Sequence, residues 1–207
     1  GILGLIGWAY LLSSLVFLFV GKNWVYLIIA FVLLLFMNVQ ENGFFESLPS
    51  FKLMISASSH VLVMAGVLCT VFYLKFAKDG TALNQFLWIV AGVGLFFIAY
   101  GFAIRPAFPI SKILATPSWT AICIGIGLLS YALLYVLVDK LGYNKWANPI
   151  KPAGTSTLTC YLLPYFIYPI MVLTGFQWPD FLSHGIVGIV KSLLFSLAII
   201  VFVGILE

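Results

Sequence analysis

Residues 85–104 read QFLWIVAGVGLFFIAYGFAI, a run without a single charged side chain. A helix needs about 20 apolar residues to cross the hydrocarbon layer of a membrane, so this run is long enough to span it. The residues that follow, 105–118, read RPAFPISKILATPS and contain two cations and three prolines. A second apolar run, Trp119–Val138, begins after them. We interpret these pieces as two membrane-spanning helices joined by a polar loop.

The composition of the whole chain agrees with this interpretation. Hydrophobic residues make up 63% of the sequence and charged residues only 8%, whereas a soluble domain carries about 25% charged residues. The mean hydropathy is +1.16. A soluble fold could not hide so much apolar surface, so we predict an integral membrane protein.

Apolar runs separated by charged or proline-bearing turns predict about seven spans. Their sequences are nearly uniformly apolar, whereas the strands of a membrane barrel alternate over about ten residues. The predicted fold is therefore an all-α, polytopic transmembrane helical bundle, with residues 1–207 as a single transmembrane domain. The predicted spans are Ile2–Val20, Trp24–Val39, Ser58–Phe76, Gln85–Ile104, Trp119–Val138, Ser156–Thr174 and Gly185–Leu206.

The first residue, Gly1, already lies in an apolar run, without an initiator Met or a charged leader before it. We therefore expect the 207 residues to be the later part of a longer multi-span protein.

The distribution of positive charge predicts an orientation. The loops after the first, third and fifth spans hold six lysines: Lys22, Lys75, Lys78, Lys140, Lys145 and Lys151. The other side holds Lys52, Arg105 and Lys112, with Lys191 near the start of the last span. Because loops rich in Lys and Arg stay in the cytoplasm, we expect the C-terminus at Glu207 to be cytoplasmic and the 105–118 loop to face outward.

Two function classes lack support in the sequence. The ten Lys and Arg residues are scattered rather than clustered, which argues against nucleic-acid binding. Cys69, Cys123 and Cys160 are widely spaced within apolar runs and form no CxxC pair, so we expect no metal site.

Two pairs of small residues, Ala99 with Ala103 and Ala121 with Gly125, have the four-residue spacing that lets membrane helices pack closely.

His60 is a weak candidate for a catalytic residue. It follows three serines in SASSHVLVMAG, at the predicted outer end of the third span. An imidazole there could act as a base or bind a ligand near neutral pH. The alternative is an interfacial histidine that is hydrogen-bonded to a neighbouring carbonyl.

The sixth span offers further candidate binding residues. Tyr161, Tyr165 and Tyr168 fall at i, i+4 and i+7, so their hydroxyls share one helix face, and Ser156 adds polarity at the start of the span. Pro164 and Pro169, within the same span, each free a backbone carbonyl, which membrane helices tolerate where they line protein or a wet cavity. A helix lining a substrate cavity fits this pattern, and so do interfacial tyrosines on a helix with ordinary proline kinks.

The 105–118 loop is the third candidate. Arg105 and Lys112 bracket two prolines and Ser111, and Trp119 closes the loop. A stiff loop with two cations suits an anionic group such as a phosphate or a carboxylate. A plain solvated connector would have a similar composition.

From this loop onward the sequence resembles a known family. The stretch from Phe108 to Pro164 contains PISKIL before a Trp, then LLYVLVD, a Lys/Trp turn and a polar span that starts with Gly154. This order is similar to the C-terminal part of the heparan-alpha-glucosaminide N-acetyltransferase-like membrane acyltransferases. The runs GILGLIGWAYLLSSLVFLF and SSHVLVMAGV resemble the middle spans of the same family.

The resemblance implies a function. Members of that family take acetyl groups from cytoplasmic acetyl-CoA and place them on the amino group of a terminal glucosamine across the membrane. Their catalytic histidine lies in an early outer loop, before the part represented here, and His60 does not match its motif. Two departures, Thr155–Ser156 after Gly154 in place of a GMN-type start and SKILATPSW in place of NKNLW, suggest a bacterial relative that acts on another sugar or envelope glycan.

We therefore expect part of a membrane-bound acyltransferase in a bacterial inner membrane, with acetyl-CoA or another acyl-CoA as co-substrate and no metal. Its expected partners are the lipid bilayer, the acyl donor and a sugar acceptor, and nucleic acid is not among them. The sequence leaves open whether the protein forms a homodimer. The predicted substrate-binding residues are Arg105, Ser111, Lys112, Trp119, Ser156, Tyr161 and Tyr165. The alternative is a transporter or flippase for a small anionic or lipid-linked solute, although one proline-broken span without a matching repeat argues against it.

Overall fold

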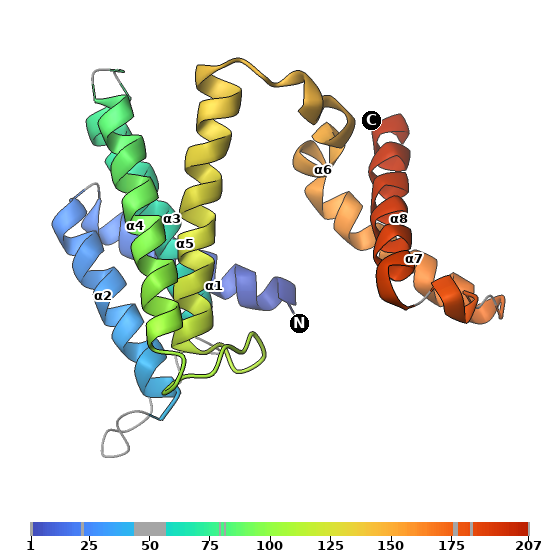
Figure 1. The fold of residues 1–207 in the computed structure, drawn as a ribbon, viewed down its shortest axis with the longest axis horizontal. Helices are drawn as coiled ribbons and strands as arrows, with labels where there is room; N and C mark the ends of the chain where they lie inside the picture. The colour runs from blue at the N-terminus through green and yellow to red at the C-terminus, as the bar shows by residue number, and fades with distance from the viewer. Residues whose placement is uncertain are drawn as a thin grey trace. The chain divides into compact units, whose positions relative to one another are not determined.

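A computed structural model describes residues 2–21, 23–43, 57–78, 80, 82–175, 178–182 and 184–206 (Figure 1). Within these ranges all regular structure is helical, as predicted. Six of the described helices are long and apolar enough to cross a membrane, and a bent pair of helices raises the number to seven. The all-α transmembrane bundle is thereby confirmed. Lys22, Lys52, Ser56 and Glu207, used in the sequence predictions, lie outside the described residues.

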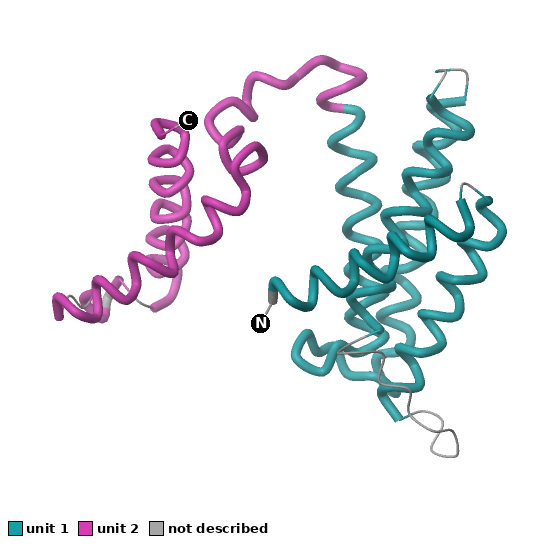
Figure 2. The backbone as a smooth tube through the Cα atoms, turned by 180° about the vertical axis from the view of Figure 1, so that it is seen from behind, with its two compact units in different colours: residues 1–136 teal, residues 137–207 magenta. Residues whose placement is uncertain are grey.

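The chain forms two compact units, Gly1–Val136 and Leu137–Glu207, which Figure 2 colours separately. The first unit holds α1 (Ile2–Val20), α2 (Trp24–Glu41), α3 (Ala57–Phe72), η1 (Tyr73–Ala77), α4 (Leu83–Ala103) and α5 (Pro117–Leu134), and η2 (Tyr135–Lys140) continues α5. The second unit holds η3 (Lys145–Ile150), α6 (Lys151–Thr155), α7 (Thr157–Leu173), η4 (Asp180–Leu182) and α8 (Gly185–Leu206).

Local sequence signals explain where several of these helices begin and end. The side chain of Asn23 caps α2 by accepting a hydrogen bond from the backbone nitrogen of Val25 at 3.2 Å. Pro117 stands in the first turn of α5, where a missing backbone N–H costs nothing. Gly21, with φ +65°, follows α1 in the left-handed conformation that favours glycine.

The apolar surface of the helices is largely left outside the protein core. Within the apolar stretches Leu3–Val20 and Ala57–Ala77, only 11% and 33% of the residues are buried. Phe19 is 88% exposed and Trp88 is 78% exposed. Such surface would be unfavourable in water, but hydrocarbon tails are as apolar as these side chains.

The core of the first unit lies between α2, α3 and α5. Leu27, Phe31 and Leu34 of α2 pack with Val61, Met64 and Leu68 of α3 and with Ile124 of α5. The helix α1 lies against α3, and α4 forms its most extensive contacts with α5.

Small residues let α4 and α5 approach closely. A Cβ atom added at Gly94 would lie 3.0 Å from the carbonyl oxygen of Gly125, and one added at Gly101 would lie 2.8 Å from that of Ser118. The predicted pair Ala121 and Gly125 is buried in this contact, as expected. Ala99 and Ala103 are both exposed in the chain, and the glycines of α4 occupy its contact with α5.

Two π-helical turns, η1 and η2, extend α3 and α5. Each begins with a tyrosine, and the hydroxyls of Tyr73 and Tyr135 lie 3.2 Å apart. Their rings pack at a centroid distance of 5.6 Å. The hydroxyl pair thus joins the ends of two helices that are distant in sequence.

The second unit contains a sharp bend. The segments Lys145–Thr155 and Thr157–Leu173 meet at an angle of 70°, with Ser156 between them. The predicted span Ser156–Thr174 matches α7 closely, but the helical segment in front of it was not predicted. The helix α7 packs against α8, where the rings of Tyr168 and Phe195 lie 5.8 Å apart.

Candidate functional site

Six buried polar side chains gather at one end of the first unit, and we call them the polar cluster. Each is at most 4% exposed, although the surrounding helices are apolar. They are Asn38, Ser58, His60, Thr116, Ser118 and Thr120. They come from the end of α2, the start of α3, the end of the α4–α5 loop and the start of α5. Figure 1 shows the α4–α5 loop and the end of α2 at the same edge of the unit.

A chain of hydroxyl hydrogen bonds links α3 to α5. The Oγ of Ser58 and the Oγ1 of Thr120 lie 2.7 Å apart. The Thr120 hydroxyl donates to the carbonyl oxygen of Thr116 at 3.0 Å. Because a hydroxyl carries only one proton, Ser58 is then the donor to Thr120.

Asn38 ties α2 to the loop before α5. Its Nδ2 donates to the carbonyl oxygen of Ala115 at 2.9 Å. Ala115 has φ +50°, a left-handed conformation that is unusual for a residue with a Cβ atom. The other end of the amide, Oδ1 of Asn38, is buried and has no hydrogen-bond partner among the described residues. A buried acceptor without a donor is costly.

Glu41 joins α2 to the start of α3. Its two carboxylate oxygens accept hydrogen bonds from the backbone nitrogen of Ala57 at 3.0 and 3.1 Å. The first N–H groups of a helix lack internal partners and carry partial positive charge, so a carboxylate is stabilising there. This contact fixes the element that carries Ser58 and His60.

The predicted residue Ser111 shapes the loop. Its backbone nitrogen donates to Oγ1 of Thr116 at 3.1 Å, and its Oγ accepts from the backbone nitrogen of Leu114 at 3.2 Å. Oγ1 of Thr116 also lies 3.3 Å from Oγ of Ser118. The loop is therefore connected to the polar cluster through Thr116.

The two predicted loop cations lie on the surface of the first unit. The side chains of Arg105 and Lys112 are both exposed. Trp119 is half-buried at the start of α5, next to the buried Ser118 and Thr120. The loop thus presents two cations on the outside and hydroxyls on the inside.

His60 lies where the sequence predicts, in the first turn of α3, at the end of a span. The structure adds that it is buried, at 3% exposure. In this conformation its imidazole does not reach the aqueous phase, which argues against a role as a solvent-accessible base.

The remaining predicted residues belong to the second unit. The hydroxyls of Tyr161 and Tyr165 lie 2.9 Å apart, so the structure brings this pair together. Ser156 lies at the 70° bend, where its backbone nitrogen donates to the carbonyl of Pro152 and its own carbonyl accepts from the backbone nitrogen of Cys160. Tyr168, on the same helix face by spacing, packs on Phe195 instead.

Five members of the polar cluster were not predicted as site residues: Asn38, Ser58, Thr116, Ser118 and Thr120. A signal was present, because Thr116 and Thr120 share a helix face at i and i+4. Asn38 and Glu41 were polar residues at the end of an apolar run. Spacing alone does not show that three elements bring these residues together.

Among the described residues no group of three His, Cys, Asp or Glu side chains could hold a metal ion. No family model, curated protein or solved structure matches the chain.

Proposed function

We propose that this chain is part of a membrane-bound acyltransferase that moves an acetyl or acyl group from an acyl-CoA to a sugar or glycan acceptor. The observation that carries the proposal is the polar cluster, a buried set of hydroxyl, amide and imidazole groups at one end of an apolar bundle. Polar side chains are costly within a membrane and mark functional sites by default. The motif resemblance supplies the reaction class.

The cluster positions the loop that would meet the acceptor. Its side chains are each at most 4% exposed. Their hydrogen bonds through Asn38, Thr116 and Thr120 hold the 105–118 loop against α2, α3 and α5. In this proposal Arg105 and Lys112 attract acidic groups of the acceptor at the mouth of the site, and Ser111 keeps their loop in shape.

Acyl transfer also requires positioning. The nucleophile and the thioester must be held about 3–3.5 Å apart, with donors placed for the developing oxyanion. In the proposal Ser156, Tyr161 and Tyr165 are substrate-binding residues of the second unit, and Trp119 packs at the acceptor mouth of the first. The resemblance assigns the catalytic base to a preceding part of the family's chain, which agrees with the burial of His60.

The location follows the same proposal. The membrane would be a bacterial inner membrane, with the C-terminus in the cytoplasm, where acyl-CoA is found. The 105–118 loop then faces the acceptor on the outer side.

The test uses vesicles that contain the full-length protein. Labelled acetyl-CoA is supplied on one side and amino sugars on the other, and transfer of label is measured. Replacing both Arg105 and Lys112 by Ala should raise KM for an acidic acceptor, because it removes charges that attract the acceptor. Lys145→Ala, which removes an exposed charge of the second unit, is the control. Absence of label on any sugar would refute acyl transfer.

One observation favours the alternative, a transporter or flippase. Transporters use interrupted helices at their binding sites, and the second unit has a 70° bend before a helix with two internal prolines. In that case the same vesicles would take up an anionic solute without any transfer of label.

A further inference from the structure

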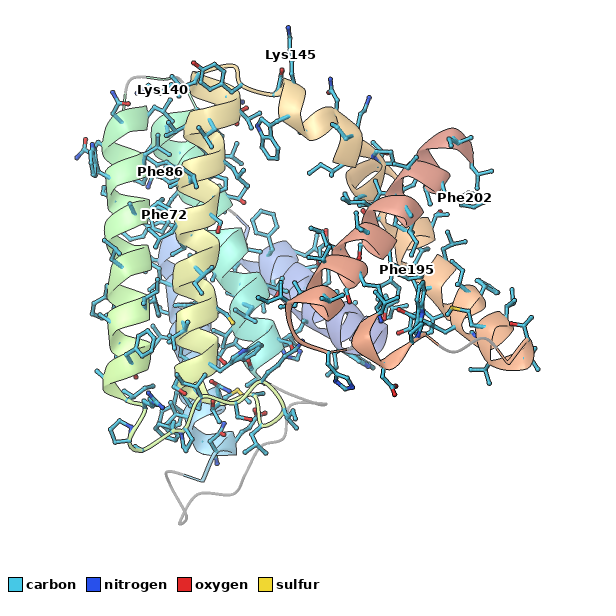
Figure 3. All side chains as sticks on the ribbon, turned by 45° about the vertical axis from the view of Figure 1, so that its right-hand side comes forward. Phe72, Phe86, Lys140, Lys145, Phe195 and Phe202 are labelled. Atoms are coloured by element: carbon cyan, nitrogen blue, oxygen red, sulfur yellow. The ribbon has the colours of Figure 1, made fainter. Side chains whose placement is uncertain are left out.

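A second feature of the first unit is an apolar groove of about 520 Å³, which no residue of the polar cluster lines. It runs along α4, whose residues Gln85, Ile89, Val93 and Phe97 line it at four-residue intervals. The buried Phe86 and Val90 line it as well. Figure 3 labels Phe72 of α3 and Phe86 of α4, which both line the groove.

The groove opens toward the surface that would contact lipid. Ile89 is 56% exposed and Val93 is 39% exposed, although both line it. From Gln85 to Phe97 the helix rises about 18 Å. One leaflet of the hydrocarbon layer is roughly 15 Å thick. The groove therefore has the length of an acyl chain that extends from the membrane surface to the bilayer centre.

A cation lies beside one end of this groove. Nζ of Lys75 is 5.0 Å from the ring centroid of Trp24 and 5.0 Å from that of Phe76. Phe76 also lines the groove, and it stacks on Phe72, another lining residue, at 5.9 Å. Cation–π contacts of this kind hold a Lys ammonium in place. Lys75 is exposed, so its charge is available to a ligand.

From these observations the geometry points to a specific site for one anionic phospholipid of the bilayer. One acyl chain lies in the groove along α4, and the phosphate contacts the Lys75 ammonium beside Trp24. The amide of Gln85, in the first turn of α4, is placed to hydrogen-bond the polar part of the lipid. The positive charge of Lys75 favours an anionic headgroup. The apolar lining of the groove favours an acyl chain over water.

The test is native mass spectrometry of the purified full-length protein in detergent. The protein is titrated with phosphatidylglycerol and with phosphatidylcholine that carries the same chains. We expect one bound phosphatidylglycerol and a preference of about fivefold over phosphatidylcholine, the size expected for one basic residue near an anionic headgroup. Lys75→Gln should abolish the preference and leave the binding of phosphatidylcholine unchanged.

A second variant tests the groove independently of charge. Val93→Trp fills the groove and should prevent binding of either lipid. Leu95→Trp adds the same bulk to an exposed position of α4 that does not line the groove, and Lys145→Gln removes a charge elsewhere, so both should bind like the unchanged protein. Thermal unfolding of each variant verifies that it is folded.

Three results would overturn the assignment. They are equal binding of the two lipids by the unchanged protein, full binding by Val93→Trp, and displacement of the lipid by palmitoyl-CoA at lower concentration than by phosphatidylglycerol. The last result would assign the groove to an acyl donor instead. Because the readout is lipid binding, a failure of the acyltransferase proposal would not affect it.

Discussion

The residues that distinguish this chain from a simple lipid-embedded bundle are its buried hydroxyls and amides. Ser58 and Thr120 are fully buried and bonded to each other across two helices. An unmet hydroxyl inside a membrane helix is costly, so the two residues depend on one another. This dependence can be measured as a coupling energy.

Thr120→Val removes the hydroxyl but keeps the shape of the side chain. We expect the double-mutant cycle with Ser58→Ala to give a coupling of about 0.6 kcal/mol, the average for hydrogen bonds between membrane helices. SDS-induced unfolding in mixed micelles measures it. In the control cycle, Thr70→Val replaces Thr120→Val and should show no coupling to Ser58→Ala. The exposed Thr70 hydroxyl bonds to the carbonyl of Gly66 in its own helix. A coupling of zero would mean that the 2.7 Å contact contributes nothing to stability.

The hydrogen bond of Asn38 gives a separate prediction about the loop that carries Lys112, because Asn38 holds this loop in place. Replacing it by Leu leaves the Ala115 carbonyl without its donor, which costs about 1 kcal/mol. Tryptic cleavage after Lys112 should then be about fivefold faster, since proteolysis follows the population of the open loop. Asn42→Leu should not change the rate, because that amide donates to the backbone carbonyl of Asn38, one turn earlier. Unchanged cleavage in Asn38→Leu would show that the loop is held by other contacts.

At the scale of elements, the sequence predicted the helices well because membrane spans have a strong compositional signal. The bounds of α1 and α8 match their predictions, and the other spans agree within a few residues. The π-helical turns η1 and η2 and the bend at Ser156 were not predicted. The two π-helical turns begin at Tyr73 and Tyr135, whose hydroxyls meet only when α3 and α5 pack. The bend at Ser156 follows Pro152 and Gly154, two residues that are unfavourable inside a helix.

The contact between α4 and α5 gives a prediction at this scale. A Cβ atom at Gly125 would overlap the carbonyl oxygen of Gly94 and Cγ1 of Ile98. Gly125→Ala should therefore reduce the free energy of unfolding by about 1–3 kcal/mol, as overpacking does. Gly127→Ala on the same helix meets no atom within 4 Å. That variant should be neutral or more stable, because Ala favours a helix by up to about 1 kcal/mol over Gly. Equal effects of both variants would contradict a close α4–α5 contact.

For the whole molecule, the central question is how the chain crosses the bilayer. If α4 crosses once, Lys78 before it and Lys112 after it must lie on opposite sides. The excess of lysines in the loops after the first, third and fifth spans predicts that Lys78 is cytoplasmic.

Cysteine labelling tests this topology. Cys69, Cys123 and Cys160 are free thiols and are first replaced by Ala. In that background Lys78→Cys should react with an impermeant reagent only from the cytoplasmic side, and Lys112→Cys only from the outer side. The cysteine-free protein, treated in inverted and in right-side-out vesicles, provides the control for background labelling. Reaction of both positions from one side would refute a single crossing by α4.

The sequence by itself determined that this protein is helical and built for a membrane, because composition and run length respond to the thickness of the hydrocarbon layer and need no partner. It also placed the two loop cations between two spans. The tertiary structure decided which polar residues act together: Asn38, Ser58 and Thr120 lie far apart in the chain and become neighbours only when α2, α3 and α5 pack. It also buried His60, since the exposure of a side chain depends on what the rest of the fold places over it.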